Sequence, residues 1–167
     1  MSGSLEVSVC EHLAELARTG RTDELLATLG TASADVVDVR DDSLLLLAAY
    51  HGHARTVGAL LSLGADPTLR NARGLSPLDG AALKGATDVI VVLLDAGADV
   101  NDTGPDGKTP LMWAAAFGRV AAVELLLKRG ADAARLDRAG STAADHARAM
   151  GSYDSIPLLG NMTATNP

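Results

Sequence analysis

Residues 104–110 read GPDGKTP, and the run Gly107-Lys108-Thr109 contains the residues with which phosphate-binding loops end. Such a loop needs the pattern G-x-x-x-x-G-K-[ST], because several backbone N–H groups must face the phosphates while the lysine reaches them. Asp102 stands where the first glycine is required, and its carboxylate would repel a phosphate. The motif is therefore incomplete, and a nucleotide-binding enzyme that uses Lys108 is the weaker hypothesis.

Other side chains with reactive or ligating groups lack the partners that chemistry would need. His51 and His53 could begin a metal site, but two ligands are too few to hold a zinc ion. The single cysteine, Cys10, lies among apolar residues and is expected to be buried and unreactive. No spacing pairs a Ser or Cys nucleophile with a base and a third, orienting group. We therefore predict no catalytic residue, no metal and no cofactor.

Composition and charge limit the possible classes of protein. The 167 residues suffice for one domain, and 47% apolar against 2% aromatic residues favour a helical core of Ala, Leu and Val. A formal net charge of -7 argues against nucleic acid as a partner. We expect a cytoplasmic monomer that neither binds a small-molecule substrate nor enters a membrane, because signal-peptide features and long apolar runs are missing. The excess of arginine over lysine suggests a GC-rich, bacterial genome.

The sequence repeats with a period of 33 residues. Glycine recurs at this spacing at Gly52, Gly85, Gly118 and Gly151. The same step separates the hydroxyl residues Ser43, Ser76, Thr109 and Thr142. Alanine follows the same step at Ala48, Ala81, Ala114 and Ala147. Agreement of several registers at one period indicates a tandem array of similar structural units.

The repeat explains the lysine motif without a ligand. Gly107 and Thr109 have counterparts in the neighbouring units, whereas Lys108 is replaced by Leu75 and Ser141. The recurring hydroxyl is typical of a helix N-cap, and the proline that follows Thr109 suits the first helical position. Each unit is thus expected to contain a first helix that ends at a glycine and a second helix with apolar residues at i, i+3 and i+4.

The segments TPLMWAAAFG at 109–118 and VELLLKRGAD at 123–132 resemble the ankyrin repeat, whose signature includes T-P-L-H-x-A. The resemblance implies an all-α fold, an α-solenoid of helix-turn-helix units joined by β-turn or hairpin loops. It also implies the boundaries of the units. These are an N-terminal tail at 1–10, an ankyrin repeat domain at 11–160 (N-cap 11–37, repeats 38–70, 71–103 and 104–136, C-cap 137–160) and a disordered tail at 161–167.

Several residues depart from the family pattern. The signature histidine is replaced in the four units by Leu46, Asp79, Met112 and Asp145. Helix capping must therefore depend on other groups. Asp41 replaces a loop glycine and Leu44 replaces a proline, so the first of these turns is expected to be less regular. Pro157 falls inside the last expected helix, which should be short.

Proteins of the family that this chain resembles bind partners with the concave face and the loop tips. The resemblance therefore predicts a non-catalytic protein–protein interaction module that acts as a regulator, scaffold or assembly factor. A stabilising subunit of a larger enzyme is the alternative. The candidate partner-binding residues are Tyr50, His51, Arg73, Leu83, Lys84, Lys108, Trp113, Phe117, Arg138 and Met150.

Two groups of these side chains have competing interpretations. Trp113 and Phe117, four residues apart on one expected helix, either anchor a partner or pack on each other. Arginines gather at the expected loop edge, at Arg40, Arg70, Arg73, Arg135 and Arg138. They either favour an acidic patch on a partner or belong to a solvated edge of mixed charge.

Overall fold

The computed structural model describes residues 6–160, and within this range the chain forms α-helices, one short 3-10 helix and no strand. The elements are α1 (Val7–Thr19), α2 (Thr22–Leu29), α3 (Leu44–Tyr50), α4 (Ala54–Ser62), α5 (Pro77–Lys84), α6 (Thr87–Asp95), α7 (Pro110–Ala116), α8 (Val120–Lys128), α9 (Ala143–Ala149), η1 (Tyr153–Ser155) and α10 (Ile156–Gly160). The all-α fold class predicted from the sequence is confirmed.

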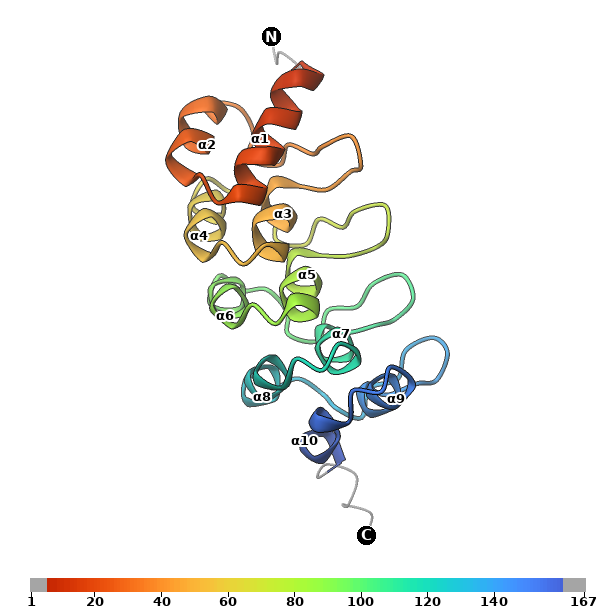
Figure 1. Cartoon of the computed structure of the whole chain (residues 1–167). Coiled ribbons are helices and arrows are strands. Elements are labelled where there is room, and N and C mark those ends of the chain that lie inside the picture. Colours follow the sequence, from red (N-terminus) through yellow and green to blue (C-terminus); the bar gives the residue numbers. More distant parts are fainter. Residues whose placement is uncertain (1–5, 161–167) are drawn as a thin grey trace.

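The helices stack in antiparallel pairs that form two rows (Figure 1). The first helices α1, α3, α5, α7 and α9 make one row, and α2, α4, α6, α8 and α10 make the other. Long loops project from the first row on the side away from the second (Figure 1). The substantial contacts among the described helices join each pair only to the pairs beside it. The molecule is therefore a linear array of layers and not a bundle around one centre.

Hydroxyl side chains start the first helices of the repeated units, as expected. Ser43, Ser76, Thr109 and Thr142 each accept a hydrogen bond from the backbone N–H three residues later, at 3.1–3.3 Å. In α5 the Ser76 N–H also donates to Asp79 Oδ2 at 3.1 Å, which completes a capping box. These bonds satisfy N–H groups that have no partner within the helix. The array therefore caps its helices without the signature histidine.

Small residues make the core thin and close-packed. The recurring alanines of the first helices, Ala48, Ala81, Ala114 and Ala147, are completely buried. The second helices contribute Val57, Ile90 and Val123 at matching positions, and these are also completely buried. Alanine lets adjacent first helices approach closely, while the branched side chains fill the space between the two rows.

The turn at Asp41 is regular, so the expectation of a less regular turn was wrong. The Asp41 N–H donates to the Asp38 carbonyl at 3.0 Å, as the Gly74 N–H donates to the Asn71 carbonyl at 2.8 Å. Asp41 reaches this conformation with a φ of 60°, and among the described residues it alone has a positive φ without being glycine. Aspartate tolerates the left-handed region better than most side chains, because its short polar group can bond to nearby backbone.

The two ends differ from the middle of the array. Helix α1 begins at Val7, inside the segment expected to be a tail. Helix α10 has five residues with Pro157 in its first turn, which confirms the short final helix. The tail predicted at 161–167 lies outside the described residues. Within the described range, every helix is too short or too polar to cross a membrane.

Candidate functional site

The loop tips are shaped by side-chain oxygens that accept two backbone hydrogen bonds each. Asp38 Oδ1 accepts from the N–H groups of Arg40 and Asp42 at 2.8 and 3.0 Å. Asn71 Oδ1 accepts from Arg73 and Leu75, both at 3.0 Å, and Asp137 holds the last loop in the same way. The loops are therefore ordered structures that fix where the arginines at their tips stand.

Arg70 ties two loops to the start of α5. Its guanidinium donates to the Gly74 carbonyl and to Asp79 Oδ2, both at 2.7 Å, and to Asp102 Oδ2 at 2.5 Å. Burial raises the pKa of the Asp79 carboxyl, while hydrogen bonds from the Ser76 N–H and from Arg70 oppose that rise. Asp79 is 0% exposed, and its Oδ1 lacks a hydrogen-bond partner. Arg70 is thus structural, which corrects its placement among the arginines available to a partner.

A hollow of about 390 Å³ opens on the first-helix side near the N-terminal end of the array. Its lining combines the buried leucines Leu46, Leu47 and Leu75, which we call the leucine floor, with polar and charged groups, some of them exposed at its rim. The lining residues are Arg18, Arg40, Asp42, Leu46, Leu47, Tyr50, His51, Arg73 and Leu75. A smaller hollow of about 320 Å³ lies beside it, against Arg40, Asp42 and Arg73.

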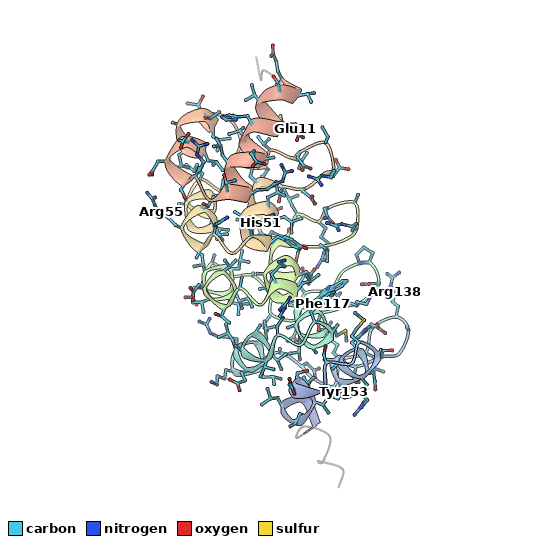
Figure 2. All side chains as sticks on the ribbon, in the orientation of Figure 1. Glu11, His51, Arg55, Phe117, Arg138 and Tyr153 are labelled. Carbon is cyan, nitrogen blue, oxygen red and sulfur yellow. The ribbon has the colours of Figure 1, made fainter. Side chains whose placement is uncertain are left out.

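Two large apolar side chains are exposed further along the same row of helices. Phe117 at the end of α7 is 40% exposed, and Met150 at the end of α9 is 58% exposed. Figure 2 shows Phe117 and His51 along the row of first helices, Arg138 on the loop side and Arg55 on the outer side of the second helices. Large exposed apolar side chains of this kind are typical anchors of protein interfaces.

A family model described as ankyrin repeats (3 copies) matches residues 13–104 and 78–166 of the chain. The chain belongs to the ankyrin repeat family. Ankyrin repeats are generally protein-interaction modules, and the family is typically non-catalytic. The comparison with curated proteins gave no match. Neither finding supports the expected bacterial source.

Some predicted binding residues of this ankyrin repeat protein already make contacts with one another. The Lys84 ammonium lies 4.9 Å from the centre of the Tyr50 ring, and the His51 ring meets the Tyr50 ring edge-on at 5.4 Å. Arg73 and Arg138 are exposed, whereas Leu83 is half-buried. The structure thus brings Tyr50, His51 and Lys84 together at the ends of α3 and α5, apart from Phe117 and Met150.

Trp113 is engaged by a lysine and not by Phe117. The Lys108 ammonium lies 5.0 Å from the centre of the Trp113 ring and 2.7 Å from Asp106 Oδ2. Among the described residues, ring contacts join Tyr50, His51 and His53, and none joins Trp113 to Phe117. The interpretation that these two aromatic rings pack on each other was therefore wrong, and Phe117 is left exposed.

The geometry around Lys108 offers nothing to a phosphate. The Gly107 N–H donates to the Gly104 carbonyl at 2.9 Å, so it closes a turn. Asp106 already neutralises the lysine.

We expect calorimetric titration with ATP and magnesium to give no binding heat with either the wild type or Lys108→Ala. Binding by the wild type that the substitution abolishes would restore the nucleotide hypothesis.

His53, one of the two histidines considered for a metal site, already contacts the backbone. His53 Nε2 lies 2.8 Å from the Arg18 carbonyl, so one ring nitrogen already has a partner. Within residues 6–160, no three His, Cys, Asp or Glu side chains gather as a metal site would require. Cys10 is half-buried, which corrects the prediction that it is buried. Cys10 lies on α1 outside the cluster of buried core residues.

The electrostatic environment of His51 is positive. Burial lowers the pKa of its imidazole, and the nearby His53, Lys84 and Arg18 lower it further, while Glu15 acts in the opposite direction. Sequence reasoning missed Arg18, because α1 lies outside the regular repeat and no register aligns it with the loops. Leu75, the counterpart of Lys108 in the preceding unit, also lines the hollow.

Proposed function

We propose that this chain is a non-catalytic interaction module that binds one protein partner through the concave row of first helices and the loop tips. It acts as a regulator, scaffold or assembly factor in the cytoplasm. The observation that carries the proposal is that Phe117, Met150, His51 and Arg73 stand exposed on this side, although none of them is needed for the alanine core. An interface built from aromatic anchors with arginine nearby fits such a surface.

The test begins with affinity capture and mass spectrometry to identify a partner, followed by titration of the purified partner. Tyr50→Ala combined with Phe117→Ala should weaken binding about tenfold or more, because buried aromatic anchors dominate interface energies. Leu63→Ala is the matched control, since Leu63 is 53% exposed but follows α4 in the second row. Unchanged affinity in the double variant, with native circular dichroism, would exclude the concave face.

The role within a complex needs a second measurement. A partner enzyme assayed with and without the chain separates the remaining possibilities. A change in its turnover supports a regulator, whereas a change only in its thermal stability indicates the stabilising subunit. Catalysis by the chain alone would contradict the proposal.

A further inference from the structure

Two arginines stand at the loop tips of the N-terminal half of the array. The loop-tip position that repeats every 33 residues holds Arg40, Arg73, Asp106 and Ala139 in turn. Both arginines therefore stand on the N-terminal half, where Lys84 and His51 face the same side. This cluster of basic side chains belongs to a chain whose formal net charge is -7. A local field opposite to the charge of the whole molecule is a feature by which partners are selected.

The arginines at the rim of the hollow have unused hydrogen-bonding capacity. In the part of the chain that the structure describes, the Arg73 side chain is in neither an ion pair nor a hydrogen bond, and it is exposed. Arg40 is 67% exposed, and its Nε lies 3.6 Å from Asp38 Oδ2. Asp38 in turn receives a direct hydrogen bond from Arg18. Two guanidinium groups are thus available to an incoming anion.

The carboxylate that lines the hollow belongs to Asp42, which is buried and hydrogen-bonded. Asp42 is 7% exposed, and its Oδ1 accepts a hydrogen bond from Asn71 Nδ2 at 2.6 Å. Three arginines and this carboxylate line the hollow, and of the three Arg73 is the one without an ion pair among the described residues, since Arg18 and Arg40 both pair with Asp38. The floor offers aliphatic side chains from Leu46, Leu47 and Leu75. A ligand that fits both parts needs negative charges at its edges and a small apolar group between them.

Building on the proposed function, we infer that the partner presents an extended acidic segment to this hollow. An aliphatic side chain lies on the leucine floor, and flanking Asp or Glu carboxylates pair with Arg40 and Arg73. The two arginines come from successive loops, which suits separate single charges along a peptide. A nucleic acid strand would bring many phosphates against a molecule of net negative charge, and the resulting repulsion would weaken its binding.

The test uses a fluorescein-labelled pentapeptide with leucine between two pairs of glutamates, titrated by fluorescence anisotropy at low ionic strength. Wild-type protein should bind it, and the affinity should fall as salt is added. Arg40→Ala combined with Arg73→Ala should weaken binding about tenfold or more, because two charge-assisted bonds are lost. The matched peptide with glutamine in place of glutamate should bind about as weakly to either protein.

The control variant, Arg135→Ala with Arg138→Ala, removes the same charge from the loop edge of the C-terminal half. It should change the affinity less than about threefold, because its arginines do not line the hollow. Equal losses in both double variants would overturn the inference, since binding would then follow net charge alone. Absence of binding to the glutamate peptide, or tighter binding of a phosphoserine peptide or an oligodeoxynucleotide, would also overturn it.

Failure of this inference is distinguishable from failure of the proposed function. If the captured partner still depends on Tyr50 and Phe117 but the glutamate peptide does not bind, the interaction module stands and the acidic segment falls. If the peptide binds as described but the captured partner does not depend on Tyr50 and Phe117, the acidic-segment inference stands and the proposed partner-binding surface falls.

Discussion

Arg70→Met is expected to lower the free energy of unfolding by about 3–5 kcal/mol, because it leaves the buried Asp79 carboxylate without its cation. Arg70 bonds to Asp79, to the Gly74 carbonyl and to Asp102, so one substitution removes all three bonds. Methionine keeps much of the apolar stem and therefore isolates the loss of the guanidinium. Urea denaturation followed by circular dichroism measures the change.

Arg55→Met provides the matched control for Arg70→Met. Arg55 pairs with Asp23 at 2.7 Å, but both side chains are more than 70% exposed. An exposed ion pair contributes little, so this variant should lose less than about 1 kcal/mol. A loss at Arg70 no larger than the loss at Arg55 would mean that the Asp79 carboxyl does not depend on its cation.

The pH dependence of the free energy of unfolding provides a second test of the Arg70–Asp79 pair. Burial already raises the pKa of Asp79, and removing Arg70 removes groups that oppose the rise. A carboxyl whose folded pKa is raised binds its proton more tightly in the folded state than in the unfolded state. Its stabilising contribution is complete below the unfolded pKa and is lost as pH rises through the folded pKa. The difference between wild type and Arg70→Met should therefore shrink as pH falls from about 7 toward about 4.

Gly107→Ala should be the second most damaging substitution, lowering the free energy of unfolding by about 2–4 kcal/mol. Gly107 has a φ of +81°, and an added Cβ would lie 2.9 Å from the Arg138 backbone nitrogen. That nitrogen donates to the Asp106 carbonyl at 2.9 Å and so joins two loops. A backbone atom cannot rotate away as a flexible side chain can. The clash should therefore break the bond between the loops.

Gly97→Ala separates the clash from the backbone strain. Gly97 has a comparable φ of +94°, but an added Cβ there would meet no atom within 4 Å. This variant should lose only the cost of the left-handed conformation, about 1–2 kcal/mol. Thermal unfolding of the two variants beside the wild type measures both effects. Equal losses would show that the loop can move away from the added methyl group.

The sequence was sufficient to predict what recurs in every unit. Capping by Ser76 and its counterparts follows from a hydroxyl at each step of the period, and the buried alanines follow from the same register. The regular turn at Asp41 was missed, because absence of glycine was given more weight than the tolerance of aspartate for a positive φ. The period therefore predicts the shared scaffold better than it predicts the exceptions.

The interactions that distinguish one unit were harder to predict. Arg70 occupies a register that holds Val37, Thr103 and Leu136 in the other units, and Asp79 replaces the signature histidine. Arg70 and Asp79 form an ion pair with each other, and only the three-dimensional structure shows that they meet. The same reason hid Arg18, which reaches the hollow from α1, where the 33-residue register of the later units is not kept. Candidate binding residues could be named from the period, whereas the grouping of some of them around the hollow, apart from Phe117 and Met150, required coordinates.

The restriction of contacts to adjacent layers has a consequence for how the chain acquires its shape. Sequence separations between touching residues stay near the length of one or two units, so assembly does not wait for the two termini to find each other. Order can nucleate in any strong layer and spread outward. A stretching force applied between the termini would load the layers in series, and the short α10 would be the first to peel away.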